Sequence, residues 1–228
     1  MGVSRMLLVD TADRHAIARW ARFPGVSGFT TNPNLMARAA GAEALRAAEY
    51  RAAAAELCRM SNDIEPVANV MIQGFGASEQ ILEQAEAYLH AIRSSAGKRL
   101  WIKLAPTRDA VSCCAALRDL GCNTLVTAVF TAAQALVAMK AGANGVAVYL
   151  GRMRKLDEQW RSRTSAISDV VGAAGGTMLL ASFPDLETVE LGLSYSQDLT
   201  VPPQVLEAML SSDLSASAME DFNARVAA

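Results

Sequence analysis

The chain has 228 residues, of which 52% are hydrophobic and 19% charged, and its formal net charge at pH 7 is −2. This balance is typical of a globular protein with a large buried interior, and it excludes an intrinsically disordered chain. The near-neutral charge predicts no basic face, which argues against nucleic acid as a partner.

Short apolar runs alternate with amphipathic segments from end to end, as strands alternate with helices. Eight runs are predicted as strands, at residues 6–10, 27–31, 66–72, 100–105, 123–129, 145–151, 177–182 and 198–202. Helix start signals follow most of them, in the form of capping side chains or a proline suited to the first turn. These signals are Thr11 with Asp13, Asn32 with Pro33, Thr107 with Asp109, Thr131, and Pro184 with Asp185.

Eight strand-helix units in one chain of this size predict a single (β/α)₈ TIM barrel domain over residues 1–228. The competing fold is an open doubly wound sheet, which would normally carry a glycine-rich turn after its first strand. Asp10-Thr11-Ala12-Asp13 stands in that place. Residues 214–228 form a surplus C-terminal helix, which we expect to cap the barrel or to pack on a neighbouring subunit.

Three features bear on the compartment. The first apolar run is too short for a secretion signal, and the uncharged stretch 120–139 contains enough polar side chains to indicate a buried strand and helix instead of a membrane span. We therefore expect a cytoplasmic protein with no membrane association. The cysteines lack C-x-x-C spacing, which predicts reduced, mostly buried thiols at Cys58, Cys113, Cys114 and Cys122.

A single lysine interrupts the apolar run LWIKLAP at residues 100–106. Burial in a strand disfavours the charged ammonium, so a fraction of Lys103 should be free amine near neutral pH. The free amine is the nucleophile that condenses with a carbonyl to form a Schiff base. The alternative is that Lys103 lies near the strand end and extends its ammonium into solvent.

In a barrel, side chains that carry chemistry lie at the C-terminal ends of the strands. Those ends supply one amine, one carboxylate, one guanidinium and several hydroxyls and amides. They are Asp10, Thr30, Asn32, Asn69, Lys103, Thr127, Tyr149, Arg152 and Ser182. The two histidines, His15 and His90, fall in predicted helices, so a zinc site or a Ser-His-Asp triad is hard to build, and we expect no metal or cofactor.

Five segments occur together in a familiar order and spacing: LVDTAD at 8–13, GFTTNP at 28–33, WIKLAP at 101–106, TAVF with AAQA at 127–135, and ASF at 181–183. Over nearly its whole length the chain thus resembles the transaldolase family, and more narrowly its short bacterial branch, the fructose-6-phosphate aldolases. The resemblance implies a (β/α)₈ barrel in which Lys103 forms a Schiff base with a ketose or with dihydroxyacetone. It also implies a homo-oligomer, a pentamer or decamer.

The resemblance assigns roles to the other strand-end residues. Asp10 matches the acid/base group at the hydroxyl where the carbon-carbon bond breaks, and Thr30 and Asn32 belong to the motif that contacts the donor. Thr127 and Tyr149 match the residues that hold a water for proton transfers, and Arg152 and Ser182 match phosphate contacts. Simpler roles stay open for several of them: Asp10 or Asn32 could only cap a helix, and Thr127 could only fill a strand.

The chain departs from the family pattern at two positions. On the third strand transaldolases carry a glutamate and the aldolases a glutamine, whereas we assign the shorter Asn69 to that position. The family also carries a lysine or arginine two residues after the ASF serine, where this chain has Pro184, so one cation of the phosphate site is missing unless Arg154 compensates. Tyr149 matches the aldolase branch, since transaldolases usually have phenylalanine there.

The sequence therefore predicts a class I, metal-independent aldolase that cleaves or forms a ketose or ketose phosphate, with dihydroxyacetone or hydroxyacetone released or used. One alternative is a transaldolase, which transfers the three-carbon unit between sugar phosphates. The other is a barrel that has lost activity and only binds sugars.

Overall fold

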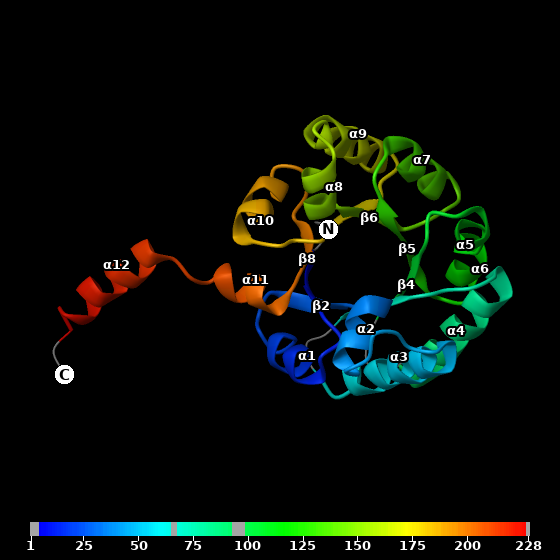
Figure 1. Ribbon diagram of the computed structural model, residues 1–228, viewed down its shortest axis with the longest axis horizontal. Helices are drawn as coiled ribbons and strands as arrows, with labels where there is room; N and C mark the ends of the chain where they lie inside the picture. Colours follow the sequence, from blue (N-terminus) through cyan, green and yellow to red (C-terminus); the bar gives the residue numbers. More distant parts are fainter. Residues whose placement is uncertain (1–4, 65–67, 93–98, 227–228) are drawn as a thin grey trace.

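The computed structural model describes residues 5–64, 68–92 and 99–226. Eight parallel strands close into a barrel in sequence order, and helices surround it (Figure 1). The strands are β1 (Leu7–Asp10), β2 (Val26–Thr30), β3 (Asn69–Gln73), β4 (Arg99–Leu104), β5 (Asn123–Val129), β6 (Gly145–Tyr149), β7 (Thr177–Ala181) and β8 (Asp198–Val201). The helices are α1 (Arg14–Trp20), α2 (Pro33–Ala39), α3 (Ala47–Ser61), α4 (Ser78–Ala91), α5 (Arg108–Ser112), α6 (Cys114–Asp119), α7 (Ala132–Lys140), α8 (Leu150–Leu156), α9 (Trp160–Ala173), α10 (Leu186–Gly192), α11 (Pro203–Ala208) and α12 (Asp213–Asn223).

The predicted barrel is confirmed, because β1 pairs with both β2 and β8 and no open edge remains. Each predicted run overlaps an observed strand to within a few residues at its ends, although residues 66 and 67 of the third run lie outside the described residues. The sixth run was predicted two residues too long: β6 ends at Tyr149 and α8 begins at Leu150, which places Arg152 on a helix. Several units also contain two helices where one was expected, as α2 and α3 show.

Side-chain caps begin several of the helices where the sequence indicated them. Asn32, Thr107, Thr131 and Asp185 each accept a hydrogen bond from a backbone N–H in the first turn of α2, α5, α7 and α10. Asp13 does the same for α1. The first-strand carboxylate, Asp10, is therefore not needed as a helix cap.

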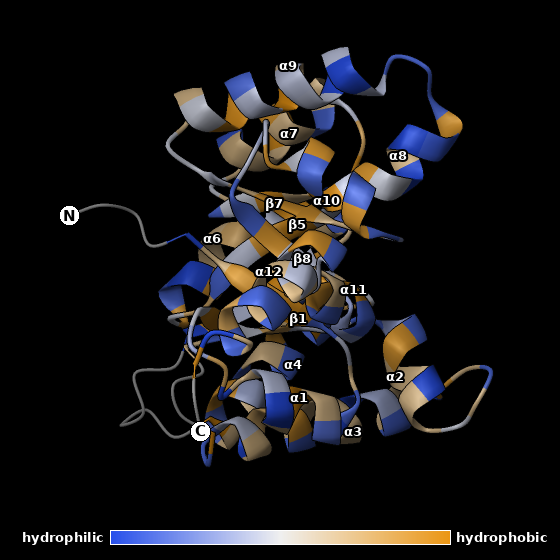
Figure 2. Ribbon diagram, turned by 90° about the vertical axis from the view of Figure 1, so that its left-hand side faces the viewer, coloured by the Kyte–Doolittle hydropathy of each residue, from blue (hydrophilic) through white to orange (hydrophobic). Residues whose placement is uncertain are grey.

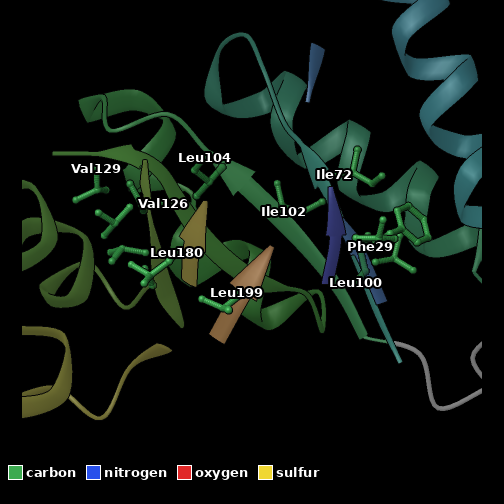
Figure 3. Close-up of a cluster of buried hydrophobic side chains, with 14 of the residues drawn as sticks. Phe29, Ile72, Leu100, Ile102, Leu104, Val126, Val129, Leu180 and Leu199 are labelled. Carbon is green, nitrogen blue, oxygen red and sulfur yellow. The ribbon is translucent and has the colours of Figure 1, made fainter. Parts of the chain in front are cut away.

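Strand alternation divides the core in two. Every second side chain points outward against the helices, and this outer core includes Phe29, Ile102, Val126 and Leu180 (Figure 3). The intervening side chains point into the barrel and form a separate inner cluster. We call six of its residues the floor layer: Leu8, Met71, Trp101, Leu125, Ala147 and Leu179. Two residues further along the same strands lies the mouth layer: Asp10, Gln73, Lys103, Thr127, Tyr149 and Ala181.

The C-terminal helix α12 exists as predicted but does not cap the barrel. It projects away from the barrel beyond α11 (Figure 1), and none of its residues is buried. Its apolar side chains Leu214, Met219 and Phe222 are exposed, as is Val226 just after it. Figure 2, coloured by hydropathy, shows strongly apolar strands β5 and β7 at the centre of the molecule, in contrast to α12.

Three further predictions can be compared with the structure. All four cysteines are unpaired and buried, as expected of reduced thiols. His15 and His90 lie exposed on α1 and α4. Among the described residues, no helix combines the length and the apolar character that crossing a membrane requires.

Candidate active site

A cavity of about 440 Å³ opens at the C-terminal ends of the strands. Two side chains of the floor layer, Ala147 and Leu179, form its base, and the mouth layer supplies five of its polar side chains. Seven of the nine predicted site residues line it: Asp10, Asn32, Lys103, Thr127, Tyr149, Arg152 and Ser182. Asn69 and Thr30 do not, whereas Asn34, Gln73 and Thr200 line it without having been predicted.

Lys103 lies inside the barrel because β4 alternates. Trp101 points inward, Ile102 outward and Lys103 inward again. The lysine residue is only 4% exposed, and its Nζ donates a 2.9 Å hydrogen bond to the backbone carbonyl oxygen of Thr31. The alternative of an ammonium extended into bulk solvent is therefore wrong, and the amine is presented to the cavity.

Asp10 is the last residue of β1, and its partly buried side chain lines the cavity. Burial raises the pKa of its carboxyl group, and the Lys103 charge and the Thr30 hydroxyl offset part of that increase. A carboxyl group with a raised pKa can both accept and return a proton nearer neutral pH than an exposed aspartate can. This is the behaviour required of an acid/base group.

The prediction that Thr30 contacts substrate is wrong in this structure. Thr30 is fully buried on β2, and its Oγ1 donates a 2.7 Å hydrogen bond to Asp10 Oδ1. A second hydrogen bond of 2.6 Å joins the hydroxyls of Thr30 and Thr200. Because a hydroxyl has one proton to donate, Thr200 is the donor to Thr30 when Asp10 is ionised. Thr30 is thus a positioning residue that holds the carboxylate of Asp10.

The assignment of Asn69 to the third-strand position is also wrong. Asn69 is the first residue of β3, at the N-terminal end of the barrel, where it pairs in register with Arg99. Its amide accepts a 3.0 Å hydrogen bond from Trp101 Nε1 and donates one of 3.2 Å to the carbonyl oxygen of Ser27. Four residues of strand, about 13 Å, separate it from the strand's other end. Asn69 therefore belongs to the structural base of the barrel.

Gln73 occupies the place that was given to Asn69. It is the last residue of β3, it is paired in register with Lys103, and it lines the cavity. Its Nε2 donates hydrogen bonds to the carbonyl oxygens of Lys103 (2.9 Å) and Gly74 (3.1 Å), which leaves Oε1 available to the cavity. A usable signal was present in the sequence: Gln73 is the first polar residue after an apolar run, as Asp10 is after Leu7-Leu8-Val9.

Thr127 and Tyr149 meet on the wall formed by β5 and β6. Thr127 Oγ1 and Tyr149 Oη are 3.4 Å apart, and both side chains line the cavity. The edge-on ring of Phe130 and the guanidinium of Arg152, 5.5 Å from the ring centroid, fix the position of Tyr149. The pair of hydroxyls can hold a water near Lys103.

Asn32 and Ser182 reach the cavity through unusual local structure. Asn32 Oδ1 caps α2 by accepting from Leu35 N at 3.1 Å, so the Nδ2 group is the part left for a ligand. The simpler role of Asn32 as a helix cap and the predicted site role therefore coexist. Ser182 follows the last residue of β7 and has a φ of +68°, a conformation in which non-glycine residues are strained. Its backbone lies so close to Gly151 that a Cβ there would be 1.9 Å from the Ser182 carbonyl oxygen.

Arg154 does not compensate for the cation missing at Pro184. Its guanidinium donates to Thr188 Oγ1 at 2.9 Å and to Glu187 Oε1 at 2.6 Å, both on α10. It does not line the cavity. Arg154 is therefore committed to holding α8 against α10.

The cavity thus combines an enclosed amine, a carboxyl group with a raised pKa, a hydroxyl pair and neutral amides. Over the described parts of the chain, no group of three His, Cys, Asp or Glu side chains is placed to hold a metal ion. An amine and an acid/base group facing the same space can activate a carbonyl compound covalently and move its protons.

Comparisons with known proteins agree with this chemistry. The family model described as transaldolase/fructose-6-phosphate aldolase matches residues 7–228. The chain is 27% identical over 220 residues to probable transaldolase 2 of Bacillus cereus, which covers 95% of each chain. It is 28% identical over 221 residues to a probable transaldolase of Roseobacter denitrificans, covering 94% of this chain and 93% of the relative.

Among solved structures, 2,3-dimethylmalate lyase superposes with a TM-score of 0.61 at 16% identity, over 97% of this chain and 83% of that one. At this identity the likeness bears on the fold alone. The family model, which matches almost the whole chain, and the probable transaldolases are more specific. They support an enzyme of the aldolase or transaldolase type. The chain belongs to the transaldolase/fructose-6-phosphate aldolase family.

Proposed function

We propose that the protein is a Schiff-base aldolase that cleaves or forms a ketose through Lys103, with dihydroxyacetone or hydroxyacetone as the three-carbon product or donor. The observation that carries this proposal is the position of Lys103, a nearly inaccessible amine that faces the same cavity as the carboxyl group of Asp10. The same strand positions also provide neutral groups that can orient hydroxyls without competing for the amine.

The reaction begins when the free amine of Lys103 attacks the ketose carbonyl carbon. The resulting carbinolamine loses water to give an iminium ion, and the Thr127 and Tyr149 hydroxyls hold the water through which its protons move. Gln73 Oε1 faces the same space and can accept a hydrogen bond from that water.

Carbon-carbon cleavage follows from the iminium ion, which withdraws electrons from the bond that breaks. Asp10 takes the proton of the hydroxyl group on the carbon that leaves, which is the carbon on the other side of the breaking bond. That carbon becomes an aldehyde, and the bonding electrons remain as an enamine on Lys103. Protonation of the enamine and hydrolysis of the iminium ion release the three-carbon ketone and restore the amine. In the opposite direction the enamine adds to an aldehyde.

Two residues favour release of the three-carbon unit over its transfer. The third-strand position at the cavity is Gln73, a glutamine as in the aldolase branch, and the residue on β6 is Tyr149 instead of phenylalanine. The second candidate function is transaldolase, which is favoured by the names of the relatives. Free dihydroxyacetone from a lone ketose supports the aldolase, whereas turnover only with an added aldehyde supports the transaldolase.

The experiment that tests the proposal is borohydride reduction in the presence of dihydroxyacetone, followed by peptide mass mapping. We expect a reduced three-carbon adduct on Lys103 and none in Lys103→Met. Lys140→Met is the matched control, because Lys140 lies exposed at the end of α7 away from the cavity and should leave the adduct intact. An adduct on another lysine, or none with dihydroxyacetone, hydroxyacetone or fructose 6-phosphate, would contradict the proposal.

We also propose that the chain forms a homo-oligomer in which α12 packs on a second copy. The four exposed apolar side chains of residues 214–226 have no cover on their own barrel. Truncation after residue 212 should reduce the number of chains per particle, measured by sedimentation, while the barrel stays folded. An unchanged number of chains per particle would contradict assembly through α12.

A further inference from the structure

A second recess adjoins the active-site cavity on the side of α8. It has a volume of about 340 Å³ and shares Arg152 and Ser182 with the cavity. The other residues around it include Lys155 from α8, Pro184 after β7 and Pro202 after β8. We call this space the outer recess. A molecule that extends from Lys103 past Ser182 would enter it.

The charged side chains that line the outer recess are both cationic, Arg152 and Lys155. They are three residues apart on α8, which places them on the same face of the helix. Two like charges in this relation destabilise a helix, unless an anion lies between them. Arg154, between them in sequence, points instead to Glu187 and Thr188 on α10.

Neither cation of the outer recess takes part in the ion pairs found within residues 5–64, 68–92 and 99–226. Arg152 rests over the Tyr149 ring, so its guanidinium is held at the boundary between cavity and recess. Ser182, also shared by both spaces, adds a hydroxyl that can donate a hydrogen bond. Two cations and one hydroxyl around a recess suit the several oxygens of a phosphate monoester.

Pro184 lines the recess without contributing a charge. Its ring packs against α8, with its Cδ 2.8 Å from the place a Cβ on Gly151 would occupy, and it contributes no cation. The positive charge therefore comes entirely from α8. This places Lys155 further from Lys103 than Arg152, at the outer end of the connected space.

We infer that Lys155 is a specificity-determining residue: with Arg152 and Ser182 it binds the phosphate group of the aldehyde substrate in the outer recess. This inference rests on the proposed aldolase function for the nature of the substrate. The anion site itself can be tested without turnover.

The first test is calorimetric titration with inorganic phosphate at low ionic strength. We expect Lys155→Met to weaken phosphate binding about 5- to 10-fold, in line with one partly exposed charged contact. Lys155→Arg should retain binding, and Lys140→Met should not change it. Equal phosphate affinity in the wild type and Lys155→Met would overturn the inference, whatever the enzyme's activity.

The second test compares glyceraldehyde 3-phosphate with glyceraldehyde as acceptors for dihydroxyacetone. The ratio of the two kcat/KM values should fall about 5- to 10-fold in Lys155→Met, mainly through KM for the phosphorylated acceptor, and should be restored in Lys155→Arg. An unchanged ratio would overturn the inference. The borohydride adduct on Lys103 is scored in parallel, so loss of the adduct marks a failure of the proposed function, and an adduct with an unchanged ratio marks a failure of the Lys155 assignment alone.

Discussion

The floor layer and the mouth layer of the barrel are built from the same six strands but do different work. The floor layer is apolar and closely packed, with Leu8, Met71 and Leu125 completely buried. The mouth layer, two residues or about 7 Å further along each strand, holds an amine, a carboxyl group, an amide and two hydroxyls around a cavity. Side-chain direction is identical in the two layers, so position along the strand alone separates stability from chemistry.

This division is useful because the floor excludes water from below. Ala147 and Leu179 line the base of the cavity that Lys103 also faces. Charged and polar groups above an apolar floor interact more strongly than they would in water. The same low polarity raises the pKa of Asp10. The floor therefore contributes to the chemistry without touching the substrate.

The largest expected effect is the loss of activity in Asp10→Asn. The amide cannot exchange a proton, so kcat should fall by about 10²- to 10⁴-fold. Asp13→Asn is the control: it makes the same chemical change three residues later, outside the cavity, and asparagine can still cap α1. Steady-state kinetics of the two variants distinguishes them. Activity retained in Asp10→Asn would exclude Asp10 as the acid/base group.

The same variant makes a prediction about stability against pH. Because the pKa of Asp10 is raised in the folded state, the folded protein favours its protonated form. That stabilising contribution is complete below the unfolded-state value of about 3.9 and is lost as pH rises through the folded-state pKa. Asp10→Asn should thus unfold at higher denaturant concentration than the wild type at pH 7, and the difference should shrink towards pH 3. A difference that grows towards low pH would contradict the raised pKa.

A pair of variants on β5 tests the two layers directly. Leu125→Ala removes a floor side chain that is 0% exposed and should lower the free energy of unfolding by about 2–5 kcal/mol. Thr127→Val, two residues on, should change it by less than about 1 kcal/mol, because the hydroxyl makes only a 3.4 Å contact with Tyr149. It should lower kcat about 10- to 100-fold by releasing the water. Urea unfolding and kinetics on both variants would reveal whether the layers are separable.

The sequence was sufficient for most of the fold and for part of the site. Alternation of apolar runs and helix caps predicted the closed barrel, and single polar residues at strand ends predicted the positions of Lys103, Asp10 and Thr127, which line the cavity. The sequence failed where the exact level and contacts of a residue on its strand had to be known. Thr30 and Asn69 share the inward direction of the site residues, but Thr30 lies beside Asp10 on β2 and is bonded to its carboxylate, and Asn69 lies at the opposite end of β3. The outer recess depends on the start of α8 at Leu150, which the sequence did not indicate.

The smallest effect separates the two ends of β3, where the sequence was misleading. Asn69→Leu keeps the approximate size but leaves the Trp101 indole N–H without its 3.0 Å partner, which should destabilise the fold by about 1–3 kcal/mol. The activity of the folded fraction should be retained, since Asn69 lies outside the cavity.

Gln73→Met should have the opposite effect. Its free energy of unfolding should stay within about 1 kcal/mol of wild type, because the two backbone carbonyls that lose the Gln73 amide can accept hydrogen bonds from water in the cavity. Its kcat should fall about tenfold, because methionine has no Oε1 to accept a hydrogen bond from the water. A larger loss of activity in Asn69→Leu than in Gln73→Met would return the third-strand role to Asn69.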